Sequence, residues 1–257
     1  MMIIKDKYYF PNNSVLVICG DVKHDAAFAS AQSIFGDWKA SDFNPHDKYP
    51  IPEFKPLTKN DYFVKESSIA QTPYMMYQWF GPDTRTDSLN TIVADVFNGI
   101  LSQNSSKWSQ ALIDKGLATY AAVQYTTNKY VGPISIFVMP NPTKLKECVE
   151  EINKQVAMMG NPDYFTDEQL ATAKATIVRN RIRRTEKPSS LASDITYWWC
   201  SASLDFFTDY QGATAKVTKE QLAAYAQKYL VGKPHVAGIV MNKEMIEQLK
   251  PAEFFKN

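Results

Sequence analysis

Apolar residues recur along the chain in two periods, one typical of strands and one typical of helices. Runs rich in Val, Ile, Met and aromatic residues, bounded by turn residues, predict strands. These strands are expected at Ser14–Cys19, Tyr62–Val64, Tyr74–Phe80, Ala118–Thr127, Val131–Met139 and His235–Met241. Because Tyr74–Phe80 carries aromatic residues and Met on both faces, we expect this strand to be buried on both sides.

Helices are predicted where apolar side chains repeat every three to four residues behind a capping residue. Thr166 with Gln169, and Thr218 with Gln221, have the spacing of capping boxes. In that motif each side chain bonds the backbone amide of the other residue. The predicted helices are Ala26–Phe35, Ser88–Leu101, Ser105–Asp114, Lys144–Met159, Thr166–Glu186, Ser190–Phe206, Thr218–Leu230 and Lys243–Leu249.

The apolar pattern breaks between residues 44 and 60. Prolines at positions 45, 50, 52 and 56 fall there without any apolar period. Each proline removes a backbone donor and moves its predecessor out of the helical region, which favours an extended linker. The chain therefore divides into a short unit, 1–43, a proline-rich linker, 44–60, and a larger complete module, 61–257.

The order of elements near the start recurs near the end. A turn, the strand Val15–Cys19, Asp21 and a helix are matched by a turn, the strand Val236–Met241, Asn242 and a helix. This repeat indicates that residues 1–43 are the tail of one module and that the rest is a second, similar module. Short loops between strands, alternating with helices, predict an α+β fold with a mostly antiparallel sheet and helices packed on one face.

Composition and charge exclude several classes of protein. The chain has 257 residues, of which 45% are apolar, and a net charge of +1. This balance argues against a dedicated nucleic-acid binder, which would carry a strongly basic domain. The longest apolar runs are far shorter than the roughly 18 residues that span a bilayer, and the start has no signal-peptide pattern. We therefore expect a soluble chain with no nucleic-acid and no membrane partner, and its compartment is undetermined.

The residue types that perform most catalysis are scattered rather than clustered. No histidine has a His or Cys three or four residues away, and there is no G-x-S-x-G, G-x-G-x-x-G or P-loop motif. The cysteines are odd in number and far apart, so they are interpreted as small buried apolar residues. We thus predict no catalytic residue, no metal site and no cofactor in this chain. The histidines and cysteines are His24, His46, His235, Cys19, Cys148 and Cys200.

Two further clusters each allow two interpretations. The arginines at positions 179, 181, 183 and 184 spread around a helix, which indicates a solvated face with salt bridges or a site for an acidic partner. The aromatic residues between 197 and 210 indicate core packing with one interface face, or a ligand cleft. These aromatic residues are Tyr197, Trp198, Trp199, Phe206, Phe207 and Tyr210.

Several motifs, in order along nearly the whole chain, resemble one family. Tyr8 to Trp38 carries Tyr-Tyr-x-Pro-Asn-Asn, Gly-Asp-Val and Phe-Gly-Asp. Gly81-Pro82, Ser105–Trp108, Phe165–Leu170 and Val217–Leu222 continue the match. This pattern is similar to that of the pitrilysin/insulinase family of zinc metallopeptidases, which includes the mitochondrial processing peptidases.

The resemblance implies a role as well as a fold. In the family two modules form a half, and two halves enclose a chamber in which unfolded peptides are digested. The zinc motif H-x-x-E-H lies on a helix of the first module, outside this sequence, so zinc is expected in that missing catalytic module. The chain is then a non-catalytic C-terminal part that forms a chamber wall, with a catalytic half and unfolded peptide as partners. The alternative is a catalytically silent family member that acts as a structural or partner-binding subunit.

One substrate-binding residue is implied by the same resemblance. Many members carry an Arg after a Leu, followed seven residues later by a Tyr, and this pair binds the substrate backbone. Here the Tyr is Tyr120, but the Arg position holds Ile113. Because Ile cannot replace a guanidinium, the pair is absent or completed by another half. The alternative for Tyr120 is a strand residue packed under the sheet.

The first predicted strand has no evident neighbour. Ser14–Cys19 is expected to belong to a sheet whose other strands precede this sequence. Since an unpaired apolar strand offers its edge to other chains, self-association is expected.

Overall fold

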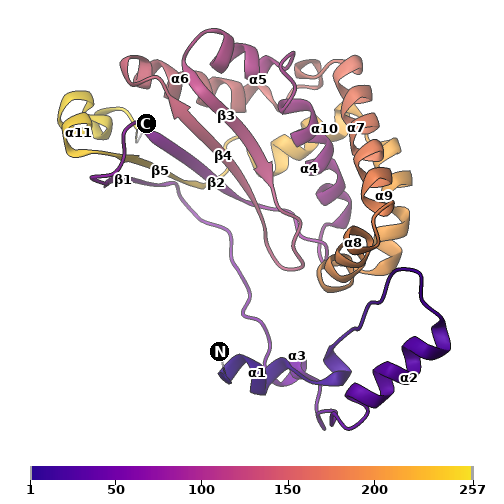
Figure 1. The fold of residues 1–257 in the computed structure, drawn as a ribbon. Helices are drawn as coiled ribbons and strands as arrows, with labels where there is room; N and C mark the ends of the chain where they lie inside the picture. Colours follow the sequence, from indigo (N-terminus) through magenta and orange to yellow (C-terminus); the bar gives the residue numbers. More distant parts are fainter. Residues whose placement is uncertain (1, 256–257) are drawn as a thin grey trace.

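The chain is built around one five-stranded sheet, and the computed structural model describes residues 2–255. The strands lie in the order β1-β5-β2-β4-β3 (Figure 1). β1 and β5 run parallel, whereas the other three neighbouring pairs are antiparallel. The predicted α+β fold with a mostly antiparallel sheet is therefore confirmed. The strands are β1 (Asp61–Glu66), β2 (Tyr74–Gly81), β3 (Ala118–Tyr125), β4 (Gly132–Pro140) and β5 (His235–Met241).

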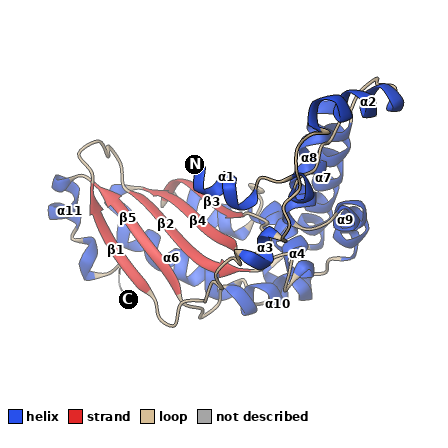
Figure 2. Ribbon diagram, turned by 90° about the horizontal axis from the view of Figure 1, so that it is seen from below, coloured by secondary structure: helices blue, strands red, loops and turns tan. Residues whose placement is uncertain are grey.

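The helices that follow β1 gather on one side of this sheet, and Figure 2 shows the strands from the other side, where none of these helices packs. Between residues 2 and 255 no helix is long and apolar enough to cross a bilayer. These helices are α4 (Ser88–Leu101), α5 (Lys107–Ser109), α6 (Leu145–Met158), α7 (Asp167–Thr185), α8 (Pro188–Ser201), α9 (Leu204–Lys216), α10 (Lys219–Tyr229) and α11 (Lys243–Leu249). The predicted helix Ser105–Asp114 is α5 followed by a π-helical turn, Gln110–Asp114.

The core lies between the sheet and the helices. Alternate residues of each strand point toward the helices, because successive side chains of a strand project to opposite faces. In β2 these are Met75, Tyr77 and Trp79, each at most 4% exposed. On the helical side, α4 contributes a wide apolar stripe to the same core, including Val96 and Phe97, which are fully buried. Burying one such side chain stabilises the fold by about 1.5–3 kcal/mol.

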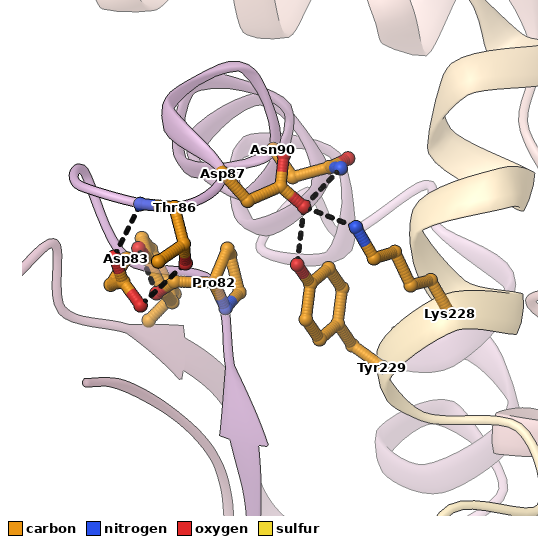
Figure 3. Close-up of polar contacts among 8 residues, drawn as sticks. Pro82, Asp83, Thr86, Asp87, Asn90, Lys228 and Tyr229 are labelled. Carbon is orange, nitrogen blue, oxygen red and sulfur yellow. Dashed lines mark hydrogen bonds and ion pairs between the residues drawn. The ribbon is translucent and has the colours of Figure 1, made fainter. Parts of the chain in front are cut away.

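The loop between β2 and α4 is held by the carboxylate of Asp83 (Figure 3). It accepts hydrogen bonds from the backbone amides of Arg85 and Thr86, at 2.9 and 2.8 Å, and from the Thr86 hydroxyl at 2.8 Å. The Tyr125 hydroxyl of β3 donates to the carbonyl of Pro82, 2.9 Å away. The turn signalled by Gly-Pro-Asp is thus fixed from both sides.

Asp87 links the start of α4 to the end of α10 (Figure 3). Its carboxylate accepts from the Asn90 side chain at 2.8 Å, from the Lys228 ammonium at 2.5 Å and from the Tyr229 hydroxyl. Burial alone would raise the pKa of Asp87, but the hydrogen bonds from Lys228, Tyr229 and Asn90 outweigh it and lower the pKa. These contacts join two helices that are far apart in sequence.

Both predicted capping boxes are confirmed. The Thr166 hydroxyl accepts from the Gln169 amide, and the Thr166 amide donates to the Gln169 side chain, both at 3.1 Å. Thr218 and Gln221 repeat this pattern at 3.3 and 2.9 Å. The two boxes differ in one respect. Gln169 is buried, and its side-chain amide also donates to the carbonyl of Ser105 at 2.8 Å.

One predicted helix is wrong, because Ser190–Phe206 is two helices. α8 ends at Ser201, and Ala202 leaves the helical region with φ −150° and ψ −103°. Ser203 then caps α9, since its hydroxyl accepts from the Phe206 amide at 3.0 Å. Serine is a preferred capping residue, so the break has a sequence signal that apolar periodicity concealed.

The predicted strand Ser14–Cys19 is also wrong as a strand, because the segment has no ladder partner within residues 2–255. It carries exposed apolar side chains, with Leu16 at 55% and Ile18 at 48% exposure. Leu16 and Ile18 lie beside Ala27 and Phe28 of the following helix, which matches the predicted one. The helices of this region are α1 (Met2–Tyr8), α2 (His24–Phe35) and α3 (Pro45–Lys48).

The two capping boxes generate a matched test. Replacing Gln169 by Ala removes a buried side chain and leaves the Thr166 amide and the Ser105 carbonyl without this partner, so the free energy of unfolding should fall by about 2 kcal/mol. Replacing Gln221 by Ala removes one cap at the surface and should cost about 0.5–1 kcal/mol. Urea unfolding followed by circular dichroism measures both, and equal losses would contradict this account.

Candidate functional site

The side of the sheet without helices is an apolar surface, named here the open face. It consists of the alternate strand residues that point away from the core. Cross-strand register brings Phe63 of β1 beside Gly238 of β5, and Gly238 beside Met76 of β2. Met76 pairs in turn with Phe137 of β4. The aromatic, Met and Val residues of the open face are Phe63, Tyr74, Met76, Phe80, Tyr120, Phe137, Met139, Val236 and Val240.

These side chains are only partly covered. Phe63, Tyr74 and Tyr120 are 45%, 40% and 45% exposed. The expectation that β2 is buried on both sides is therefore wrong. The Tyr74 and Phe137 rings lie 6.3 Å apart, centroid to centroid, which places aromatic surface across two neighbouring strands. Contiguous apolar surface is typical of faces that bind a partner or a ligand, which makes this face the candidate site.

Gly238 allows the aromatic surface to reach the edge strand β1. A Cβ atom added at Gly238 would lie 2.2 Å from the Phe63 ring, so the ring rests directly on the backbone of β5. Any larger residue at position 238 would push Phe63 away. The glycine thus keeps the surface flat across β1, β5 and β2.

Polar groups on the open face are few and central. The Gln78 side chain of β2 donates to the Ser135 hydroxyl of β4 at 3.2 Å, and Gln124 of β3 lies opposite Ser135. The charged strand residues of this face are Asp61 and Lys65, both on β1. An uncharged amide and hydroxyl beside aromatic rings suit the backbone and apolar side chains of an extended peptide.

Tyr120 lies on the open face, at the edge strand β3 opposite Met139. Its 45% exposure rules out packing under the sheet. Ile113, in the π-helical turn, is partly buried against the core instead. The position that would hold a guanidinium thus supplies apolar packing, and the role of Tyr120 in substrate binding stays a prediction.

The aromatic residues between 197 and 210 divide into two groups. Trp198, Phe206 and Tyr210 pack on one another, with Trp198 centroids 5.0 Å from Phe206 and 5.7 Å from Tyr210. Tyr197 and Trp199 are about two-fifths exposed. Tyr210, which is 9% exposed, donates its hydroxyl to the carboxylate of Asp95 on α4 at 2.5 Å.

Asp95 is a residue that sequence reasoning missed. It lies in α4 between the buried residues Ala94 and Val96, and a charged residue inside an apolar run was the available signal. Burial raises its pKa from 3.8 to about 6, although the hydrogen bond from Tyr210 acts in the opposite direction. A carboxylate so perturbed inside a protein is a candidate functional group.

The predicted arginine run spreads around α7 as expected. Arg184 forms an ion pair with Asp194 of α8, through Nε at 2.9 and 3.1 Å. Arg181 lies over the Phe207 ring and donates to the Phe207 carbonyl. Arg179 donates to the Thr176 hydroxyl at 3.1 Å. Binding of an acidic partner by this helix stays a prediction.

The cysteines and histidines do not converge. Cys148 is buried, and burial raises its thiol pKa to about 12, but Cys19 is partly exposed and Cys200 exposed, so the expectation of burial is wrong for these two. His24 and His46 are exposed, and burial lowers the pKa of His235. Across residues 2–255 no group of three or more His, Cys, Asp or Glu side chains could hold a metal ion. The described residues therefore do not fit a zinc ion.

The raised pKa of Asp95 makes stability depend on pH. From about pH 4 to pH 6 the unfolded chain loses this proton while the folded chain keeps it, so the free energy of unfolding falls, by roughly 2–3 kcal/mol in all. Asp95→Asn keeps an acceptor for Tyr210 without the charge. It should raise the free energy of unfolding by about 1–3 kcal/mol at neutral pH, with a gain that shrinks toward zero near pH 4. Urea titrations at both pH values measure this, and a gain independent of pH would contradict the assignment.

The chain was compared with known families and structures. Residues 4–177 match the model of the peptidase M16 inactive domain. A search of curated proteins gives no match. A protease from Helicobacter pylori superposes with a TM-score of 0.80 at 19% identity, over 94% of this chain and 59% of that one. The peptidase M16 inactive domain from Pseudomonas fluorescens gives 0.68 at 17%, over 87% and 52%.

The first half of a periplasmic protease from Escherichia coli is also similar, with a TM-score of 0.70 at 13% identity, over 99% of this chain and 57% of that one. At such identities these structures show the fold, and the chain spans little more than half of their length. The match to the family model covers more than half of this sequence, so it shows membership of the family and not only a similar fold. The open-faced sheet and its helical layer therefore belong to a protein of the peptidase M16 family, in the non-catalytic module that corresponds to its inactive domain.

Proposed function

We propose that the open face is a peptide-binding wall of an M16 zinc peptidase, which holds extended, apolar segments of unfolded substrate. The observation that carries this proposal is a sheet face of partly exposed aromatic and Met side chains that no helix of residues 61–255 covers. Methionine and aromatic side chains adapt to many apolar partners, which suits a surface that receives unfolded peptides of varied sequence.

Hydrolysis is assigned to a separate module. Residues 2–255 hold no group of three or more side chains that could ligate zinc, so in this proposal zinc-activated water belongs to a catalytic half in the same or a partner chain. The work of this module is then to hold the substrate. Tyr120 contributes an exposed aromatic ring at the edge of the wall, and with Ile113 at the partner position it acts without a guanidinium from this chain.

Residues 1–43 are proposed to be the tail of a preceding module. The internal repeat equates Val15–Cys19 with β5, which lies inside the sheet with a parallel neighbour, β1, and an antiparallel neighbour, β2. In this repeat Leu16 and Ile18 take the positions of Ala237 and Ile239, which are fully buried against the helical layer, whereas Leu16 and Ile18 line a pocket with Ala27 and Phe28 of α2 and remain about half exposed. An apolar segment with this pattern would fit the interior of a sheet supplied by the preceding module, and residues 44–60 then act as the linker between the modules.

The open face makes a specific prediction for binding. Phe137→Ser and Phe63→Ser should each weaken binding of a flexible fluorescent peptide rich in Leu and Phe by about ten-fold, because each removes an aromatic contact of the open face. Leu89→Ser is the matched control, since Leu89 is an exposed apolar residue of α4 at 51%. Fluorescence anisotropy gives the three affinities.

Two results would contradict the binding proposal. One is an equal loss of peptide affinity in Leu89→Ser and in the open-face variants, which would indicate nonspecific adhesion. The other is tight binding of a folded protein together with no affinity for the unfolded peptide. That outcome would favour the alternative, a catalytically silent structural or partner-binding subunit.

The unpaired segment makes a prediction about association. The 257-residue chain should self-associate with rising concentration, and the double variant Leu16→Asp, Ile18→Asp should reduce the association, because charge blocks pairing of an exposed strand. Ile69→Asp is the control, since Ile69 is 88% exposed in another loop. Static light scattering distinguishes them, and a wild-type chain that stays monomeric would overturn the prediction.

A further inference from the structure

A cavity of about 690 Å³ lies in the helical layer, where α4, α7, α8 and α9 meet. These helices lie away from the open face (Figure 1). The volume is within the range of about 300–1,000 Å³ that is usual for small-molecule sites. Its apolar walls include Ile177, Trp198, Phe207 and Tyr210. The peptide-binding proposal does not use this cavity. Ligand binding here can therefore be tested separately from peptide binding on the open face.

An acidic group without a charged partner lines this cavity. Asp95 Oδ2 accepts from the Tyr210 hydroxyl at 2.5 Å, whereas its Oδ1 has no hydrogen-bond partner among residues 2–255. No ion pair involves Asp95 in that part of the chain. Asp95 is partly buried and has no cation beside it, so a donor from a ligand would stabilise its carboxylate.

A basic group without a charged partner lines the same cavity. The Arg181 guanidinium lies 4.2 Å from the centroid of the Phe207 ring and donates to the Phe207 carbonyl, but no carboxylate of residues 2–255 pairs with it. Arg184 differs, because its charge is matched by Asp194. The cavity is thus lined by the Arg184–Asp194 ion pair and by two charges of opposite sign, Asp95 and Arg181, that lack charged partners.

We propose that this cavity binds a free α-amino acid with an aromatic or large aliphatic side chain. The ligand's ammonium would pair with Asp95 Oδ1, its carboxylate with the guanidinium of Arg181, and its side chain with the apolar surface of Trp198. A ligand with only one charge would leave the other protein charge without a partner. A zwitterion with an apolar body is the class of ligand that satisfies both.

Binding is tested by isothermal titration calorimetry on the whole chain with L-phenylalanine at neutral pH. We expect saturable binding at one site. N-acetyl-L-phenylalanine, which lacks the ammonium, and phenethylamine, which lacks the carboxylate, should each bind at least about ten-fold more weakly, the size expected for losing a charge-assisted hydrogen bond. No saturable binding of L-phenylalanine, L-tryptophan or L-leucine overturns the proposal, as does equal affinity for N-acetyl-L-phenylalanine.

Variants test the two charges from the protein side. Asp95→Asn and Arg181→Gln should each lower the affinity for L-phenylalanine by about ten-fold or more. Asp95→Asn is expected to fold, since it removes a partly buried charge and keeps an acceptor for Tyr210, and circular dichroism checks this. Arg183→Gln, on the same helix but outside the cavity, should leave the affinity unchanged. Undiminished binding by Asp95→Asn overturns the proposal, as does a loss in Arg183→Gln equal to that in Arg181→Gln.

Discussion

The rest of this structure depends on one constraint: helices bury only one of the two faces of the sheet. Helices cover one face, and alternate strand residues such as Met75 and Ile136 are fully buried there. The residues between them point away from the helices and remain partly exposed. Fully burying one apolar side chain contributes about 1.5–3 kcal/mol of free energy. A broad, partly exposed aromatic face is therefore expected to be covered by a partner. The peptide-wall proposal follows from that exposure.

The polar side chains of the helical layer have two different roles. Asp83 accepts from the loop before α4, Asp87 accepts from Lys228 of α10, and buried Gln169 of α7 donates to the carbonyl of Ser105, so these groups fix the ends of α4 and α7. Asp95 is different, because burial raises the pKa of its carboxyl, so that its charge lowers stability at neutral pH. Groups that lower stability in this way are common where a protein binds a ligand.

Much of the fold could be predicted because local signals coincide with tertiary structure. The bounds of α4, β5 and α11 agree with the apolar periods, and both capping boxes form as written in the sequence. Two errors have one cause. Ser14–Cys19 and Tyr74–Phe80 are apolar on both faces, and such a run does not reveal whether its cover comes from the same chain or from a partner. The break at Ala202 was concealed because apolar residues continue through it.

The candidate sites were less predictable, because they depend on residues brought together from distant parts of the chain. Phe63, Gly238 and Phe137 form one surface only through the strand order β1-β5-β2-β4-β3, which periodicity does not give. Asp95 and Tyr210 are 115 positions apart, so their contact has no local signature. Tyr120 was identified through family resemblance, and its exposure on the open face became evident only from the sheet register.

Photo-crosslinking of an unfolded peptide tests the central claim most directly. A Leu- and Phe-rich peptide that carries a benzophenone side chain would be bound to the chain, irradiated, and its attachment sites located by mass spectrometry. The peptide-wall account predicts attachment at open-face residues of β2, β3 and β4, such as Met76, Tyr120 and Met139. Attachment mainly to the helical layer or to the exposed segment 14–38 would contradict it.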